Sequence, residues 1–190
     1  VRAESDLEQL PQSLRDIAVR IVHACGMPDV VADIAWGGDP VTAARNALLA
    51  DGPIITDAQM VAEGIIKSRL PEGNRVVCTL NDARVPMIAK QLSTTRSAAA
   101  VDLWDEYLPN SVVVVGNAPT ALFRLLERLQ EGAPRPAVIL GFPVGFVGAA
   151  ESKQALMDAP LDIPFITVRG RRGGSAMAAG AANALARPSE

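Results

Sequence analysis

The segment Ser111-Val112-Val113-Val114-Val115-Gly116-Asn117-Ala118-Pro119-Thr120 decides the fold. Four consecutive valines favour a strand with both faces buried, because a half-exposed strand alternates apolar and polar residues. Pro119 follows at a position that suits the first turn of a helix, and leucines at 122, 125, 126 and 129 give that helix one apolar face. The segment therefore predicts a buried strand followed by an amphipathic helix.

Similar β-rich runs recur along the chain with helical patterns between them. The segment Val138-Ile139-Leu140 is also continuously apolar, as in a strand covered on both sides. Such an alternation predicts an α/β fold: a three-layer α/β/α arrangement around a mostly parallel sheet of about five strands. We expect one domain over residues 1–190. The expected strands are Pro53–Thr56, Arg75–Leu80, Ser111–Gly116, Ala137–Gly141 and Pro164–Val168.

Three further helices are expected from periodicity and capping residues. Thr56 or Asp57 is a suitable N-cap for a helix through Arg69, with Met60, Val61, Gly64 and Ile65 on one face. A second helical segment extends from Pro86 to Leu108, with an interruption at residues 93–95. The last, from Gly174 to Ala186, consists almost entirely of small residues and can therefore approach its neighbour closely.

The composition excludes several classes of function. The 190 residues are 49% hydrophobic and 4% aromatic, with a net charge of −3. A nucleic-acid-binding protein needs clustered basic charge and aromatic stacking platforms, so we expect no nucleic-acid partner. One histidine and two distant cysteines cannot form a Cys/His zinc site, so no protein-held metal is expected. The function must therefore rest on other chemistry.

The cysteines and the apolar segments indicate the cellular compartment of the protein. Cys25 and Cys78 are far apart in sequence, which favours reduced thiols over a disulfide framework. No basic and then apolar segment of the signal-peptide type opens the chain. The most apolar stretch, residues 174–186, is too short to cross a bilayer. We therefore expect a cytoplasmic protein without a membrane partner.

His23 is the only histidine and lies near the end of a predicted helix. Ser13 is a suitable N-cap, Gly26 a suitable C-terminal stop, and the apolar stripe of this helix runs through Leu14, Ile17, Ala18, Ile21 and Cys25. At about 100° per residue, His23 falls opposite that stripe. The helix dipole favours an imidazolium in the last turn, which makes His23 a candidate proton donor. The alternative is that it only binds terminal carbonyls or faces water.

Three predicted strands end in loops of small residues. These loops are residues 115–120, 140–151 and 168–175, and they would lie at the carboxyl edge of a parallel sheet. Helix N-termini there offer backbone amides to anions, and glycine lets a ligand approach the backbone. The chain has no Gly-x-Gly-x-x-Gly after the first strand and no Gly-Lys-Ser/Thr, which argues against dinucleotides and triphosphates. We interpret the edge as a binding site, although tight turns alone would also require glycine.

Arginine supplies nearly all the basic charge, since Lys67, Lys90 and Lys153 are the only lysines. A GC-rich genome would by itself enrich arginine. The functional interpretation is that Arg96, Arg169 and Arg171 bind carboxylates in the bidentate way that guanidinium favours. The expected ligand is therefore an organic acid.

Taken together, several motifs resemble the precorrin-8X methylmutase family, also called precorrin isomerases. The resemblance covers essentially the whole chain and is most specific over Gly145-Phe146-Val147-Gly148-Ala149-Ala150-Glu151-Ser152-Lys153. The other matching segments are His23-Ala24-Cys25-Gly26, Thr95-Arg96-Ser97-Ala98-Ala99-Ala100, residues 115–122, and 168–176.

The resemblance implies an isomerase of cobalamin biosynthesis. Such an enzyme moves a methyl group from carbon 11 to carbon 12 of the macrocycle by a 1,5-sigmatropic shift, giving hydrogenobyrinic acid without a cofactor. The resemblance assigns the acid/base role to His23 and substrate contact to Arg96. With the loop analysis, it makes Thr95, Gly116, Asn117, Gly145, Arg169 and Arg171 further expected contacts of the carboxylate-rich tetrapyrrole.

The resemblance also implies a homodimer whose site is bordered by both subunits, which would explain why His23 faces away from its own core. Family members carry a further segment ahead of the counterpart of Val1, with a serine that contacts the substrate. Two alternatives to the metal-free reaction remain: isomerisation of the cobalt-containing counterpart, and a corrinoid carrier without turnover. A dinucleotide oxidoreductase is suggested only by the layered pattern.

Overall fold

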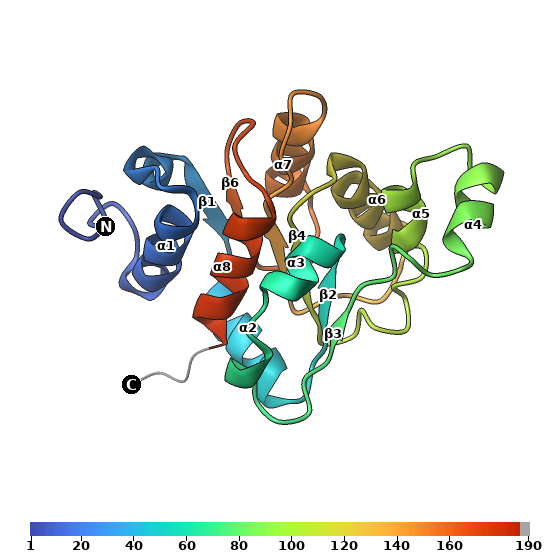
Figure 1. Ribbon diagram of the computed structural model, residues 1–190, viewed down its shortest axis with the longest axis horizontal. Coiled ribbons are helices and arrows are strands. Elements are labelled where there is room, and N and C mark those ends of the chain that lie inside the picture. Colours follow the sequence, from blue (N-terminus) through green and yellow to red (C-terminus); the bar gives the residue numbers. More distant parts are fainter. Residues whose placement is uncertain (187–190) are drawn as a thin grey trace.

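Six strands form one sheet in the computed structural model, which describes residues 1–186 (Figure 1). The strand order is β1-β6-β5-β4-β2-β3, and only the β1–β6 pair is antiparallel. The strands are β1 (Ile34–Gly37), β2 (Ile54–Thr56), β3 (Val76–Val77), β4 (Val112–Val115), β5 (Val138–Gly141) and β6 (Phe165–Val168). The expected mostly parallel sheet is confirmed.

Helices precede or follow each strand. The α-helices are α1 (Gln12–Cys25), α2 (Pro40–Leu49), α3 (Gln59–Gly64), α4 (Val85–Gln91), α5 (Arg96–Val101), α6 (Pro119–Gln130), α7 (Ala149–Asp158) and α8 (Ser175–Leu185). Two short 3-10 helices, η1 (Pro28–Asp33) and η2 (Lys67–Arg69), complete the set.

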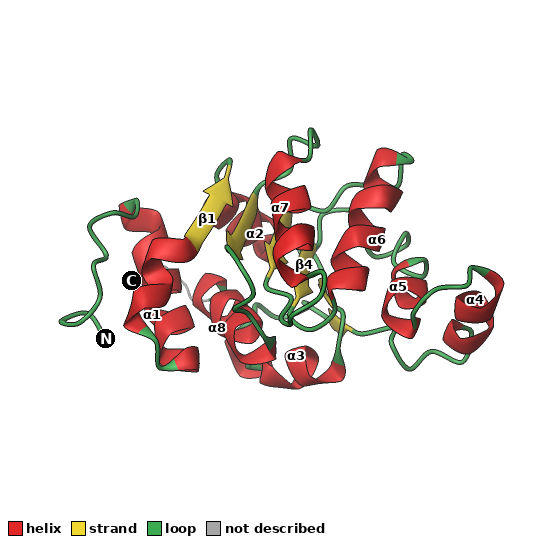
Figure 2. Ribbon diagram, turned by 90° about the horizontal axis from the view of Figure 1, so that it is seen from above, coloured by secondary structure: helices red, strands yellow, loops and turns green. Residues whose placement is uncertain are grey.

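The two faces of the sheet belong to two separate hydrophobic cores, which explains the uninterrupted valines. Val112 and Val114 pack with apolar residues of α1, α2 and α8, whereas Val113 and Val115 pack with those of α5, α6 and α7. Seen from above, α8 and α3 lie on one side of the strands and α6 and α7 on the other (Figure 2). The three-layer α/β/α expectation is therefore confirmed.

The sheet has one strand more than expected. Strand β1 has only four residues, ends at Gly37 and is followed directly by Gly38, so its sequence carries little strand signal. It pairs antiparallel with β6 at the sheet edge. The expected strand over residues 75–80 is shorter in the structure, because only β3 (Val76–Val77) pairs with β2. The other expected strands are confirmed within a residue or two.

Some helix ends differ from expectation. Helix α1 begins at Gln12, so Ser13 is not its N-cap, but Gly26 terminates it in a left-handed conformation (φ 69°). The helix expected over residues 57–69 is split into α3 and η2, and Met60 is exposed rather than buried. The segment 86–108 is interrupted before Arg96 as expected, but its helical part ends at Val101.

Candidate functional site

The three glycine-rich loops meet at the carboxyl edge of the sheet. Strands β4, β5 and β6 are mutually parallel, so the loops that follow them leave the same edge. The Val144 amide donates to the Asn117 carbonyl (3.3 Å), and the Gly145 amide donates to the Arg171 carbonyl (3.4 Å). The Gly174 amide donates to the Phe142 carbonyl (2.8 Å). The loops therefore form one continuous backbone surface.

Glycine is required where two of these loops touch. A Cβ atom on Gly173 would lie 2.5 Å from the carbonyl oxygens of Phe142 and Pro143. A Cβ on Gly116 would lie 2.7 Å from side-chain carbons of Val61 and Ala178. At these two positions, close packing within the protein accounts for the glycine, independently of any ligand.

The carboxylate of Asp57 accepts hydrogen bonds from the three backbone amides that follow β4. Its Oδ1 accepts from the Gly116 amide (2.8 Å), and its Oδ2 accepts from the amides of Asn117 (3.0 Å) and Ala118 (2.8 Å). Burial raises the pKa of the Asp57 carboxyl, although these amides oppose the shift. The expectation that Thr56 or Asp57 caps the following helix is therefore wrong, because Ala58 occupies the N-cap position of α3. Any ligand contact of Gly116 or Asn117 must use other atoms than these amides.

Thr95 and Arg96 begin α5 beside the loop after β4. The Thr95 hydroxyl accepts from the Ala98 amide (3.1 Å), which caps the helix, and lies 2.9 Å from the Thr120 hydroxyl. Arg96 is exposed, and its Nη2 donates to the Leu80 carbonyl and to Asn81 Oδ1, both at 3.2 Å. The structure therefore brings Thr95 to the loop surface and leaves the Arg96 guanidinium without a carboxylate partner among residues 1–186.

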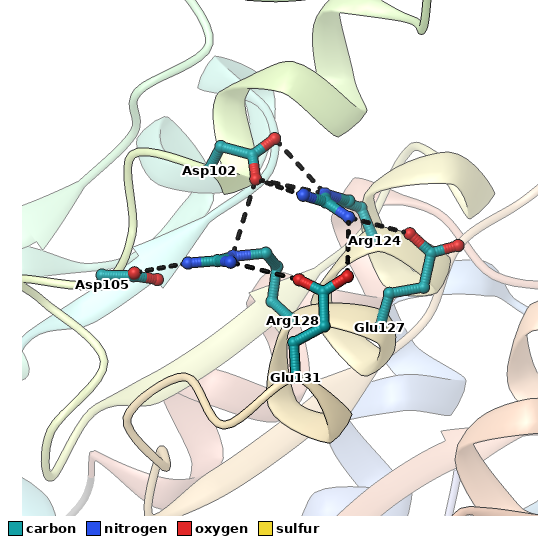
Figure 3. A network of polar contacts seen from close by, with 6 residues as sticks. All are labelled: Asp102, Asp105, Arg124, Glu127, Arg128 and Glu131. Carbon is teal, nitrogen blue, oxygen red and sulfur yellow. Dashed lines mark hydrogen bonds and ion pairs between the residues drawn. The ribbon is translucent and has the colours of Figure 1, made fainter. Parts of the chain in front are cut away.

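A network of six charged residues fixes α5 against α6 (Figure 3). Asp102, just after α5, binds Arg124 of α6 (Nη2 to Oδ1, 2.7 Å) and also contacts Arg128. Arg128 binds Asp105 (2.5 Å), and Glu127 and Glu131 complete the network. These contacts attach the C-terminal end of α5, the short helix that Thr95 caps, to α6.

The two arginines expected from the third loop are exposed. Arg169 and Arg171 have no carboxylate partner within the described residues. The guanidinium of Arg171 lies over the ring of Phe146, 5.6 Å from its centroid. Phe146 and Val147 are 83% and 89% exposed. The loop surface therefore combines apolar groups with two available cations.

His23 lies on the outer surface in the last turn of α1. Helix α1 packs on α8, where the Arg20 carbonyl and Ala24 approach Gly180 (Figure 1). The imidazole makes no hydrogen bond or ion pair within residues 1–186. The expected position opposite the buried stripe is confirmed. No hydrogen bond or ion pair of the imidazole links His23 itself to the loop cluster within residues 1–186.

Sequence reasoning gave no role to Lys153 and Arg172, which connect α7, the third loop and η1. Lys153 is fully buried and its Nζ donates to the Arg172 carbonyl (2.6 Å). The Arg172 guanidinium binds Asp29 (2.6 Å) and Asp33. The role of Asp57 could have been suspected from its position directly after a buried strand, at the carboxyl edge of the sheet. For Lys153, the sequence gave no sign of burial.

Three further features concern metal binding, membrane spanning and a second cavity. Residues 1–186 contain no group of three or more His, Cys, Asp or Glu that could hold a metal ion. Over the same residues, no helix is long and apolar enough to span a membrane. A cavity of about 390 Å³ lies at the opposite, amino edge, beside Phe165 and Pro164. Its Asp39 is already used, because it caps α2 through the Thr42 amide.

The fold and the loop cluster define a layered α/β protein, a class in which ligands generally bind outside the carboxyl ends of the parallel strands. Comparison with known proteins then gives the family. The family model described as precorrin-8X methylmutase matches residues 1–188, and the chain belongs to this family. The expected isomerase of corrin biosynthesis is thereby confirmed as its class of function.

Individual relatives agree with this assignment. A precorrin-8X methylmutase from Pseudomonas aeruginosa is 59% identical over 186 residues, 98% of this chain and 89% of the relative. One from Sinorhizobium sp. is 56% identical over 188 residues, covering 99% and 90%. A crystal structure of a precorrin-8X methylmutase from Thermus thermophilus has a TM-score of 0.84 at 37% identity, covering 95% and 89%. A cobalt-precorrin-8 methylmutase from Salmonella typhimurium is 41% identical over 172 residues, covering 89% and 79%.

Proposed function

We propose that this chain converts precorrin-8X to hydrogenobyrinic acid by a 1,5-sigmatropic methyl shift, with His23 as the acid/base group. The observation that carries the proposal is the exposed imidazole of His23, which has no hydrogen-bond or ion-pair partner within the described residues and lies in the range that the family model matches. The bond between carbon 11 and the methyl group breaks while the bond to carbon 12 forms. The reaction is an isomerisation and needs no co-reactant.

Protonation explains why an acid would accelerate this shift. A proton donated to the conjugated macrocycle spreads positive charge over the ring and weakens the bond to the migrating methyl group. The same imidazole recovers the proton after the shift. His23 suits this role because it occupies the last turn of α1, where the helix dipole stabilises a cation.

The loop surface supplies complementary groups for the substrate. Arg96, Arg169 and Arg171 are exposed and form no ion pair with residues 1–186, so they are available for peripheral carboxylates. Gly145, Asn117 and the side chain of Thr95 border the same surface. Apolar groups such as Phe146 would face the macrocycle. Positioning of the ring by these contacts would supply the rest of the rate.

We also propose a homodimer in which one active site uses groups from both subunits. This fits the outward-facing imidazole of His23, which no hydrogen bond or ion pair within residues 1–186 links to the loop cluster. The free thiols of Cys25 and Cys78 fit a reducing compartment, and we infer a cytoplasmic enzyme.

The direct test is the change His23→Ala, followed through the absorbance of the macrocycle and paired with a binding measurement. We expect substrate binding to persist while turnover falls by at least about a hundredfold, the usual scale of general acid catalysis. Undiminished turnover would remove His23 from the mechanism. His23→Gln serves as a matched variant that keeps a polar side chain but cannot act as the acid.

A parallel assay with cobalt-precorrin-8 decides between the two substrates. The relatives with 59% and 56% identity carry the precorrin-8X name, which favours the metal-free compound. Faster turnover of the cobalt compound by the same purified enzyme would reverse this assignment. Binding of both compounds without rearrangement would support a carrier.

A further inference from the structure

Lys153 places an ammonium group in the protein interior. Its side chain has no exposed surface, and its Nζ donates to the carbonyl oxygen of Arg172 at 2.6 Å. Burial lowers the pKa of Lys153 to about 8, with the charge of Asp33 opposing the shift. Lysine is rarely buried in full, because removing its charge from water is costly.

The carbonyl that Lys153 binds belongs to a loop with several further attachments. The Arg172 side chain forms ion pairs with Asp29 and Asp33, both in η1. The Arg169 amide donates to the Asp33 carbonyl at 2.8 Å. Helix α7, the loop of residues 169–174 and η1 are thus joined through one short chain of polar contacts.

Both ends of this chain of contacts lead to proposed active-site residues, which in the proposed homodimer are what one subunit contributes to the two sites. The loop of residues 169–174 carries Arg169 and Arg171, two proposed substrate contacts. Segment η1 begins at Pro28, shortly after Gly26 ends the helix that carries His23. A displacement of the Arg172 backbone would therefore alter the position of the arginines relative to the His23 helix.

Stability alone does not explain an ammonium at this position. Lys153 forms no ion pair within residues 1–186, and its recorded partner is a backbone carbonyl. An apolar side chain of similar length would fill the same space without the cost of burying charge. A buried charged group that lowers the stability of the fold is a candidate for a functional role.

We propose that Lys153 is a positioning residue of this isomerase: its hydrogen bond to the Arg172 carbonyl fixes the loop of residues 169–174 relative to η1 and the His23 helix. The proposal rests on the proposed function, which assigns His23 and the two arginines to the active site. Lys153 itself does not touch the reacting atoms. It acts through the placement of groups that do.

The test compares two side chains of equal length, each one atom shorter than lysine. Lys153→Met has no donor, whereas Lys153→Gln keeps an N–H donor without charge. We expect Lys153→Met to lower kcat by about tenfold to a hundredfold, the effect of a small misplacement of catalytic groups. Lys153→Gln should retain most of kcat. Both proteins should unfold at no lower temperature than the wild type. Lys90→Met, a change at an exposed lysine of α4, is the control and should leave kcat unchanged.

Each result decides the proposal. Unchanged kcat in Lys153→Met would overturn it, as would equal losses in the Met and Gln variants, because the donor would then be irrelevant. If Lys153→Met fails to fold, a folded Lys153→Gln with nearly full kcat supports the proposal and a folded, slow one overturns it. The His23→Ala variant tests the proposed function separately. Full activity of His23→Ala would show that His23 is not the acid, whereas the comparison of Lys153→Met with Lys153→Gln tests whether the hydrogen bond to Arg172 positions the loop.

Discussion

The carboxylate of Asp57 binds the backbone amide of Gly116 at 2.8 Å, 59 residues further along the chain. It also accepts from the next two amides, so the turn after β4 is closed by a buried carboxylate of the protein. Helix α6 starts directly after this turn, at Pro119. An anion that approaches this edge of the sheet therefore meets amides that are already paired, and must bind to side chains instead.

The first prediction concerns Asp57→Asn. The amide side chain offers only one oxygen acceptor, and its NH2 group would face backbone N–H donors that Asp57 now satisfies. An unsatisfied buried donor costs about 1–3 kcal/mol. We expect the free energy of unfolding to fall by about that amount, measured by urea denaturation at neutral pH. Asp39→Asn, at an exposed helix cap, is the control and should cost less. Equal stabilities of wild type and Asp57→Asn would show that the turn does not depend on the carboxylate.

The second prediction concerns the charged network between α5 and α6. The Asp102 side chain is only 16% exposed and binds Arg124, which is 21% exposed. Hydrogen bonds to charged groups contribute about 1.5–3 kcal/mol when water is largely excluded. We expect Asp102→Asn to lower the free energy of unfolding by about 1–3 kcal/mol, and to weaken substrate binding through Thr95.

The matched control for Asp102 is Asp16→Asn. Asp16 pairs with Arg2, and these side chains are 79% and 65% exposed. Exposed pairs contribute little because water and salt screen them. Asp16→Asn should therefore change stability by less than about 0.5 kcal/mol. A comparable loss in both variants would mean that the network contributes no more than a surface pair.

The central strands could be predicted from sequence because their signal is local. Val112–Val115 and Val138–Leu140 are uninterrupted apolar runs, and the structure covers both of their faces. The same holds for the position of His23, which follows from helical phase alone. Strand β1 was missed because four residues at an antiparallel edge carry little periodicity.

The roles of Asp57, Lys153 and Arg172 could not be predicted, because their partners are distant in sequence. Asp57 precedes a helix and has the composition of an N-cap, but its partners begin at Gly116. Lys153 belongs to a recognisable motif, yet only the folded chain places its ammonium against Arg172. Capping rules describe neighbours along the chain. These contacts depend on which loops the parallel sheet brings to one edge.

The third prediction follows from the pKa of Lys153, which is about 8 in the folded protein against an ordinary value of 10.5. Between these two pH values the unfolded chain binds more protons than the folded one, so the free energy of unfolding rises with pH. The gain is absent below about pH 8 and complete above about pH 10.5. Denaturation of Lys153→Met and wild type from pH 7 to 10 should show this rise only in the wild type. Lys90→Met, with an exposed lysine replaced, should retain it. Parallel curves for Lys153→Met and wild type would mean that Lys153 keeps an ordinary pKa.

The last prediction tests whether one active site draws on two subunits. His23 on α1 and Arg96 on α5 belong to helices on opposite faces of the sheet, and no recorded contact within residues 1–186 joins them. If each site combines His23 of one subunit with Arg96 of its partner, then His23→Ala and Arg96→Leu should each be nearly inactive alone. A mixed dimer of the two variants would contain one site with both changes and one intact site. Random reassortment of an equal mixture makes half of the dimers mixed, so activity should recover to about one quarter of the wild-type value. A mixture of His23→Ala with His23→Gln is the control and should stay inactive. If both residues serve the same site from a single chain, every site in the mixed dimer carries one change, and the mixture would show no recovery.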